Sequence, residues 1–301
     1  MENFKLEDFQ EATRVIREFI PRTALHKSPS LSNLLSAKIY LKLENQNVTG
    51  SFKIRGAMYS VKTLKNIYEE FITASSGNHG LACAWAFSRV NTIGKIYLPE
   101  KISQLKLEKL TKTGCELIFV DGDQVEVELA AKNAAEANKS KVKFLSPYND
   151  LNIIRGQGTI GIEIFQQCPK VDVVFVTVGG GGLISGVAAA LKLQKPSIKI
   201  YGCLPKNSPV MKESIEAGKI IEMESKETLS DGNEEQIIEG AAGVGLASMI
   251  KKAPEIKGKF VVSILCGGNI DEKTHSKILF DRKKVRKTRI VRSLEEPELI
   301  T

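Results

Sequence analysis

Short apolar runs alternate with longer amphipathic stretches along most of the chain. The runs rich in β-branched and aromatic residues predict strands, and the stretches between them, such as 124–139 and 186–194, predict helices. Such alternation is typical of parallel sheets covered by helices on both faces, so the expected fold class is α/β. The clearest strands are expected at 39–43, 70–75, 94–99, 115–120, 142–146, 171–178, 198–203 and 260–265.

The spacing of these strands predicts two domains with mainly parallel, twisted sheets. Four strands between about 70 and 146 form one compact set, which predicts a smaller α/β domain over 67–147. The larger domain is then discontinuous, with residues 1–66 and 148–301, and its last part, 281–301, reads as a basic tail. A chain of 301 residues with 42% hydrophobic residues can bury cores of this size.

Composition bounds the environment of the protein. No apolar run is long enough to span a bilayer, and the polar start of the chain reads as a helix and not as a signal peptide. The five cysteines show no CxxC spacing, which fits a reducing compartment. These features predict a cytoplasmic globular protein without a membrane partner.

The net charge of +8 raises the question of nucleic-acid binding. Seven of the eleven residues from 282 to 292 are basic and account for nearly all of the excess. No aromatic residue interleaves with this run, and no recognised nucleic-acid motif accompanies it. A solvated tail explains the run better, so no nucleic-acid partner is expected.

A glycine-rich loop, VGGGGLISG at 178–186, follows the predicted strand 171–178 and precedes a helix. Glycines let the backbone approach an anion, and the helix start supplies free N–H groups. A tight turn alone would need one or two glycines. The Walker A pattern and the GxGxxG dinucleotide pattern both fail here, so a single small phosphate is expected instead of ATP or NAD.

A second polar loop, TASSGNHG at 73–80, also lies between a strand and a helix. Its hydroxyl, amide and backbone N–H groups make a nest suited to a carboxylate, although a simple helix cap remains an alternative. A third loop, CGGN at 266–269, is weak evidence alone. The three histidines and the cysteines offer no zinc-ligand spacing, and there is no GxSxG motif for a hydrolytic triad.

Lys53, in GSFKIRGA at 50–57, is either a surface lysine beside a packed helix or a buried amine held for chemistry. Together with the three loops it offers an amine, a phosphate cradle, a carboxylate nest and a thiol. Pyridoxal 5'-phosphate requires such a set: a lysine for its aldehyde, a seat for its phosphate and partners for its ring.

In this order the four motifs resemble those of the fold-type II pyridoxal-phosphate enzymes, in the threonine/serine dehydratase and serine racemase branch, from about residue 10 to 280. The resemblance implies that Lys53 forms the imine with the cofactor and then acts as general base at the α-carbon. It implies that Asn78 binds the ring hydroxyl and that Ser76 serves as the opposite-face base in racemising relatives. The implied phosphate ligands are Gly179, Gly180, Gly181, Gly182 and Leu183, and the implied substrate ligands are Ser75, Ser76, Gly77 and His79.

Cys266 matches the family position that faces the pyridine nitrogen. A thiol is a weak donor and cannot stabilise a pyridinium as a carboxylate would. The ring is then a weaker electron sink, which favours prompt loss of a β-hydroxyl over transamination. The alternative is a buried structural cysteine.

Two departures from the family pattern qualify the resemblance. Leu204 and Val210 occupy the positions of acidic residues in metal-binding racemases, so no metal is expected. The motif at 228–232 runs almost directly into 237–245, so the larger domain looks shortened between residues 232 and 238. No regulatory domain is expected after residue 280, which argues against a feedback-controlled biosynthetic form.

The resulting hypothesis is a pyridoxal-phosphate ammonia-lyase that converts L-threonine or L-serine to a 2-oxo acid and ammonia, as a homodimer. One alternative is serine racemase. Another is a non-catalytic pyridoxal-phosphate-binding relative, inactivated by the shortened large domain.

Overall fold

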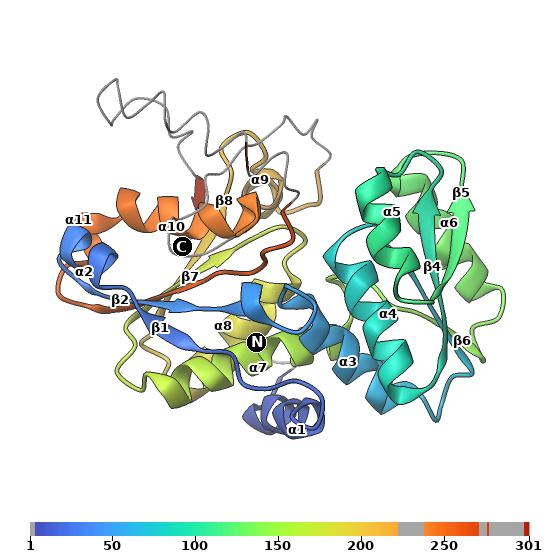
Figure 1. The fold of residues 1–301 in the computed structure, drawn as a ribbon. Helices are drawn as coiled ribbons and strands as arrows, with labels where there is room; N and C mark the ends of the chain where they lie inside the picture. Colours follow the sequence, from blue (N-terminus) through green and yellow to red (C-terminus); the bar gives the residue numbers. More distant parts are fainter. Residues whose placement is uncertain (1–3, 222–237, 271–275, 277–297, 301) are drawn as a thin grey trace.

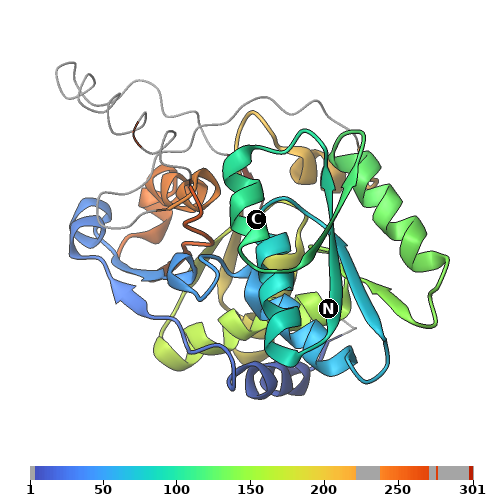
Figure 2. The same ribbon diagram turned by 45° about the vertical axis from the view of Figure 1, so that its right-hand side comes forward.

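The computed structural model describes residues 4–221, 238–270, 276 and 298–300, and it contains two sheets with helices packed around them. Figure 1 shows the sheets in two neighbouring groups of elements, with helix α3 (Lys53–Leu64) between them, and Figure 2 shows the same arrangement after rotation. The architecture is α/β, as the alternating pattern predicts.

The larger sheet has six strands in the order β1-β2-β9-β7-β8-β10. Its four inner strands are parallel, and its two edge strands pair antiparallel with their neighbours. The inner strand β7 is buried on both faces, and its sequence VVFVT is a run of β-branched and aromatic residues. The strands are β1 (Leu25–Lys27), β2 (Lys38–Lys42), β7 (Val173–Thr177), β8 (Lys199–Leu204), β9 (Phe260–Ile264) and β10 (Glu298–Ile300).

The smaller sheet has four parallel strands in the order β5-β4-β3-β6. The strands are β3 (Glu70–Ala74), β4 (Ile93–Pro99), β5 (Glu116–Val120) and β6 (Val142–Phe144). Helix α6 (Gln124–Glu136), which packs on this sheet, begins at a capping box: Asp123 accepts from the amides of Val125 and Glu126, and Glu126 accepts from the Asp123 amide.

The helices cover the sheets and supply most of their packing partners. They are α1 (Leu6–Ile16), α2 (Pro29–Leu35), α4 (Asn78–Val90), α5 (Gln104–Thr111), α6 (Gln124–Glu136), α7 (Leu151–Gln167), α8 (Gly182–Gln194), α9 (Val210–Ala217), α10 (Gly240–Lys251) and α11 (Ala253–Ile256), with a 3-10 turn at Glu44–Gln46.

Helix α3 joins the two groups of elements. Its buried Ile54 and Met58 belong to the apolar cluster that contains Phe71 and Phe87 of the smaller group. Another side of α3 packs against α7, which covers the larger sheet. Residues of the predicted larger domain therefore share a core with the smaller sheet, and the domain boundary near residue 66 stays a prediction.

All eight predicted strands are present, with ends that differ by one or two residues. The pattern missed β1 and β10, each of which is only three residues long. Strand β10 lies within the stretch 281–301 that was predicted as a basic tail, and its residues Glu298–Ile300 pair with the edge of β8, whose backbone groups are available for pairing. The basic run at 282–292 lies outside the described residues, as does the stretch predicted to be shortened, apart from Ile238.

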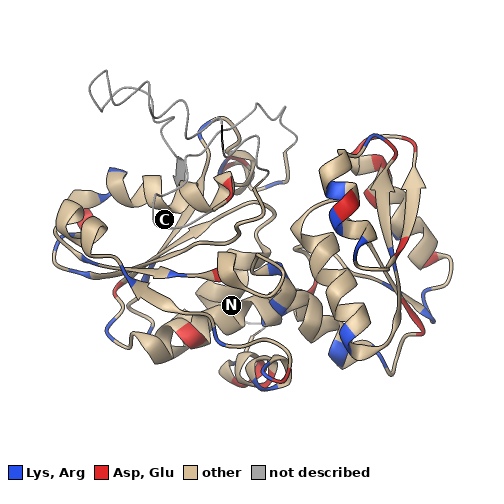
Figure 3. Ribbon diagram, in the orientation of Figure 1, with Lys and Arg blue, Asp and Glu red and all other residues tan. Residues whose placement is uncertain are grey.

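Charged positions of both signs are interspersed over the described elements (Figure 3). Within the described ranges, no helix is long and apolar enough to cross a membrane.

Candidate active site

The loops that the sequence singles out follow the carboxyl ends of parallel strands. β3 ends just before Ser75, β7 leads into Val178 and the glycine loop, and β9 leads into Cys266. In open α/β sheets this edge is where ligands bind. Lys53 is the first residue of α3, the helix that lies between the two groups of elements (Figure 1).

The amine of Lys53 is held inside the protein. Its Nζ donates to the backbone carbonyl of Pro147 at 2.8 Å, and the side chain is only partly exposed. Burial lowers the pKa of Lys53 to about 8, although the nearby acidic groups of Cys83, Cys266 and Glu239 act to raise it. A substantial fraction of the amine is therefore neutral near pH 8, unlike that of a surface lysine.

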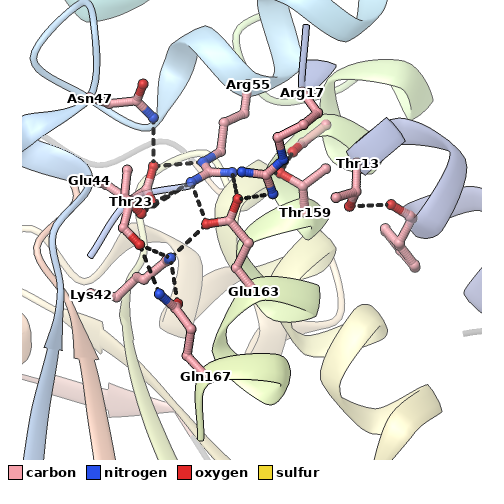
Figure 4. Close-up of polar contacts among 12 residues, drawn as sticks. Thr13, Arg17, Thr23, Lys42, Glu44, Asn47, Arg55, Thr159, Glu163 and Gln167 are labelled. Carbon is pink, nitrogen blue, oxygen red and sulfur yellow. Dashed lines mark hydrogen bonds and ion pairs between the residues drawn. The ribbon is translucent and has the colours of Figure 1, made fainter. Parts of the chain in front are cut away.

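A buried ionic cluster fixes the helix that carries this lysine (Figure 4). Two residues after Lys53, the Arg55 guanidinium contacts Glu44 at 2.7 and 2.8 Å and Glu163 at 3.0 and 2.9 Å. Lys42 contacts the same Glu163 carboxylate at 2.6 Å. These side chains come from β2, the turn after it, α3 and α7, so the cluster locks the start of α3 onto the larger sheet.

The charged groups of this cluster shift one another's pKa values. Burial raises the pKa values of Glu44 and Glu163, but the charges and hydrogen bonds of Arg55, together with the charge of Lys42, outweigh it and both pKa values are lowered. The pKa of Arg55 is raised, because the two carboxylates outweigh the effect of its burial. Glu44, Glu163 and Arg55 are therefore charged at neutral pH, and each depends on its partners for solvation. Burial lowers the pKa of Lys42, against which the carboxylates of Glu163 and Glu44 act.

The loop after β6 contacts three parts of the site. The Leu145 carbonyl faces His79 Nε2 at 3.1 Å, and the Pro147 carbonyl accepts from Lys53. Tyr148 packs on the glycine loop so closely that a Cβ at Gly180 would lie 2.5 Å from its ring. Sequence reasoning missed this loop, although its place after a parallel strand was an available signal.

The glycine loop combines packed and open positions. A Cβ at Gly182 would lie 2.9 Å from the Tyr148 backbone, whereas one at Gly179 would meet no atom within 4 Å. Gly181 has φ +86°, a conformation that favours glycine, and it forms the cap of α8. The loop thus presents backbone N–H groups and a helix start beside open space, while Leu183 is buried in the larger core.

The start of α4 is a second group of backbone donors. Its cap is Gly77, which supplies no side-chain acceptor for the first turn. The loop is tight, because a Cβ at Gly80 would lie 2.1 Å from the Ser75 carbonyl oxygen. Ser75 and Ser76 are partly exposed on this loop. The geometry suits an anion at the helix start.

The ring of His79 points away from this anion position. It is buried, and its Nε2 lies 3.1 Å from the Leu145 carbonyl and 3.5 Å from Cys83 Sγ. Burial, followed by the charge of Lys53, lowers the pKa of His79 to about 3, so the ring is neutral. The predicted contact between His79 and a substrate carboxylate therefore depends on its backbone N–H group.

Cys266 lies buried at the end of β9, beside the Lys53 loop: the Phe52 amide donates to its carbonyl at 3.0 Å. Burial, with the charge of Glu239, raises the pKa of its thiol. The thiol is thus neutral at physiological pH, as the predicted role beside a ring nitrogen requires.

Asn78 belongs to a network that the sequence did not reveal. Its Nδ2 donates to both oxygens of Glu239, at 3.0 and 2.8 Å, and its Oδ1 accepts from Asn269 Nδ2 at 2.7 Å. Glu239 lies in the stretch 237–245, to which the sequence assigned no role at the site, and it is distant in sequence from Asn78, so only the fold brings the two together.

The residues present fit pyridoxal phosphate. Lys53 supplies an amine with a depressed pKa, and the backbone at Gly179 faces open space at a helix start. The hydroxyls of Thr49 and Ser51 are buried beside Lys53 without a hydrogen-bond partner among the described residues, and they offer further donors to a polar ligand. Leu204 is buried, Val210 begins α9, and the described residues contain no cluster of three His, Cys, Asp or Glu side chains for a metal.

Comparison with known proteins gives a consistent result. Residues 16–237 match the family model described as pyridoxal-phosphate dependent enzyme. An L-threonine ammonia-lyase from Thermotoga maritima is 36% identical over 306 residues, covering 88% of this chain and 76% of the relative.

Two solved structures share the fold over most of their length. The processed form of threonine deaminase isoform 2 from Solanum lycopersicum has a TM-score of 0.83 at 26% identity, covering 91% of this chain and 92% of that one. Maize serine racemase has a TM-score of 0.82 at 27% identity, covering 94% and 99%. From its site, its fold and these similarities, the chain belongs to the family of pyridoxal-phosphate dependent enzymes.

Proposed function

We propose that the protein is an ammonia-lyase that removes the β-hydroxyl of L-threonine or L-serine and releases a 2-oxo acid and ammonia. The observation that carries the proposal is the neutral, buried thiol of Cys266 at the end of β9. A neutral partner leaves the ring nitrogen uncharged, which favours rapid loss of a β-substituent. The similarity to a threonine ammonia-lyase over 88% of the chain supports the same reaction.

Each group of the site has one task in this proposal. Bound pyridoxal phosphate would supply the aldehyde that holds the amino group and the ring that makes the α-proton acidic. Lys53 would hold the cofactor through its amine and, once displaced, take the α-proton, for which a pKa of about 8 is well suited. The water lost with the β-hydroxyl is regained when the released product hydrolyses to the 2-oxo acid and ammonia.

The loops would orient the reactants. Backbone N–H groups of 179–183 at the start of α8 would bind the phosphate, and those at 77–79 with Ser75 and Ser76 would bind the substrate carboxylate. Asn78 would donate to the ring hydroxyl. These assignments follow from the geometry of donors at two helix starts and from the family motifs.

Racemisation of serine is the second candidate, since maize serine racemase is similar over 94% of the chain. It requires the deprotonated α-carbon to persist until a group on the opposite face, such as Ser76, returns a proton. The neutral partner at Cys266 works against this, because the β-hydroxyl leaves first. Elimination is therefore favoured.

The test is incubation of the purified protein with L-threonine and L-serine, with separate assays for 2-oxo acid and D-amino acid. We expect 2-oxo acid to form faster than D-serine and a divalent-metal chelator to change the rate little. D-serine as the main product, or activity lost to chelation and restored by magnesium, would make racemase the better assignment. Bound cofactor without turnover of either amino acid would indicate a non-catalytic relative.

We also propose that the enzyme acts in the cytoplasm on free amino acids, as a homodimer, without nucleic acid or membrane as a partner. The absence of CxxC spacing among its five cysteines supports a reducing compartment. Size-exclusion chromatography with light scattering tests the dimer.

A further inference from the structure

Glu239 places a carboxylate where separate segments of the chain meet, and the proposed mechanism does not use it. It is the cap residue of α10, and its amide donates to the Gly267 carbonyl at 3.0 Å. Its side chain turns to the start of α4 in the smaller group, where both oxygens accept from Asn78 Nδ2.

The orientation of the Asn78 amide is set from both ends. Its nitrogen faces Glu239, and its oxygen accepts from Asn269 Nδ2, which also donates to the Thr49 carbonyl at 2.9 Å. Glu239 can only accept when ionised, so it admits the Nδ2 end of the amide and excludes the oxygen. A primary amide has two N–H groups, so one remains for another acceptor after one is directed to the carboxylate.

Two glycines leave room for this arrangement. A Cβ at Gly267 would lie 2.4 Å from Glu239 Oε1, and a Cβ at Gly50 would lie 2.7 Å from Asn269 Oδ1. Gly50 has φ +72°, and its carbonyl accepts from the Gly268 amide at 2.9 Å. The segments that carry Lys53 and Cys266 are thus packed against the network, at positions where a larger residue would displace it.

The charge of Glu239 also reaches the amine of the site. Burial raises the pKa of Glu239, whereas the hydrogen bond from Asn78 and the charges of Lys53 and Lys109 act to lower it. In turn, Glu239 is among the groups that raise the pKa of Lys53. The carboxylate is therefore electrostatically coupled to the amine as well as bonded to the amide.

We propose that Glu239 is a positioning residue: it turns the Asn78 amide so that an N–H group, and not the carbonyl oxygen, is presented to the ring hydroxyl of the cofactor. The inference rests on the proposed function, because it requires pyridoxal phosphate bound with its ring beside Asn78. It adds to the site a residue to which the sequence motifs assigned no role.

The experiment compares Glu239→Ala, Glu239→Gln, Asn78→Ala and the double variant Glu239→Ala/Asn78→Ala in the full chain. Glu255→Gln is the matched control, since Glu255 also accepts hydrogen bonds, from Tyr201 and Lys252, but on α11. Each protein is freed of cofactor and titrated with pyridoxal phosphate to give Kd and the absorption maximum of the bound cofactor. The Tm of the cofactor-free protein is measured in parallel.

We expect Glu239→Ala and Asn78→Ala each to weaken pyridoxal phosphate binding by about tenfold, since each removes a hydrogen bond to a charged or cofactor group. The double variant should be no more than about twofold worse than either, because the two residues act as one unit. Glu239→Gln retains an acceptor, so its Kd should stay within about threefold of the parent, while loss of the charge shifts the absorption maximum.

Two results would overturn the inference. One is a double variant in which the effects of the two substitutions on Kd multiply as if independent. The other is a Kd and an absorption maximum like those of the parent in both Glu239 variants. If Glu239→Ala does not fold, Glu239→Gln decides: an absorption maximum equal to that of Glu255→Gln is evidence against a role at the cofactor. If the parent protein binds no pyridoxal phosphate, both the proposed function and the inference are refuted. If the parent binds pyridoxal phosphate and turns over its substrate, and the Glu239 variants bind the cofactor as the parent does, only the inference is refuted.

Discussion

The Lys53 amine donates to the carbonyl of Pro147, 2.8 Å away and 94 positions further along the chain. Pro147 precedes Tyr148, which packs on the glycine loop, so one short segment contacts both the amine and the loop predicted to bind the phosphate. The carbonyl holds the amine in place while burial keeps its pKa low. The contact explains how a lysine at the start of a helix is kept inside the site.

Replacement of Lys53 by alanine should abolish turnover and the absorbance of covalently bound cofactor, because it removes the amine that performs both tasks. The Tm of the cofactor-free variant should stay close to that of the parent, since burial of an amine costs free energy. Lys62→Ala, at a partly exposed position of the same helix, is the control and should retain activity. Normal elimination by Lys53→Ala would refute the assignment of the site.

Attachment of the cofactor to the empty protein should depend on pH with a midpoint near 8. Only the neutral amine attacks an aldehyde, so the rate should fall about tenfold per pH unit below the pKa of about 8 and level off above it. Stopped-flow absorbance at pH 6 to 10 measures this rate. A rate that continues to climb toward pH 10.5 would indicate an ordinary, solvated lysine.

Two glycines of the loop, Gly182 and Gly179, should respond differently to alanine. Gly182→Ala forces a Cβ to within 2.9 Å of the Tyr148 backbone, so it should destabilise the cofactor-free protein by about 1–3 kcal/mol. Gly179→Ala places its Cβ in open space and should leave that stability within about 0.5 kcal/mol of the parent.

If Gly179 faces the phosphate, its alanine variant should nevertheless weaken pyridoxal phosphate binding by about tenfold or more, because the backbone can no longer approach the anion. Urea unfolding and cofactor titration of both variants provide the two readouts. Equal loss of stability in the two variants would contradict the packing described above.

Glu163→Gln should destabilise the protein by about 3–5 kcal/mol, because it leaves Arg55 and Lys42 buried without their shared carboxylate. Glu136→Gln, which breaks an exposed pair with Lys139, is the control and should cost less than about 0.5 kcal/mol. Urea unfolding at pH 7 gives both values.

The same variant should alter the acid dependence of stability. The pKa values of Glu44 and Glu163 are lowered in the folded protein, so their contribution is present above the unfolded pKa of about 4.3 and is lost as pH falls through the folded pKa. The free energy of unfolding of the parent should therefore fall steeply below about pH 4. Between pH 3 and 4.5, the free energy of unfolding of Glu163→Gln should change less steeply with pH than that of the parent. An unchanged slope would show that Glu163 does not contribute to the acid dependence of stability.

Substitutions at Cys266 should separate a ring partner from a structural cysteine. Cys266→Ser should retain elimination, because a hydroxyl can make the same neutral hydrogen bond. Cys266→Asp should protonate the ring nitrogen, change the absorption spectrum and increase side reactions. Cys203→Ser, a buried thiol on β8, controls for the cost of a buried hydroxyl. A spectrum and product ratio in Cys266→Asp identical to those of the parent would place Cys266 away from the ring.

The sequence determined the strands and helices of this protein and predicted the chemistry of its loops. The strands were predictable because β-branched runs such as VDVVFVTV between amphipathic stretches leave few alternatives. Lys53, the glycine loop and the polar loop at 73–80 were identifiable because their chemistry depends on residue type within a few consecutive positions. Edge strands such as β1 were missed, since three residues carry too little periodicity.

The tertiary structure alone decided which distant residues meet. Glu239 joins Asn78 across 161 positions, and Glu163 joins Arg55 across 108, and no local pattern predicted either contact. Tertiary packing also directed the His79 ring into the core and shared α3 between the two groups of elements. Such contacts depend on how helices and strands far apart in sequence are brought together, and hydrophobic periodicity encodes only which face of each element is buried.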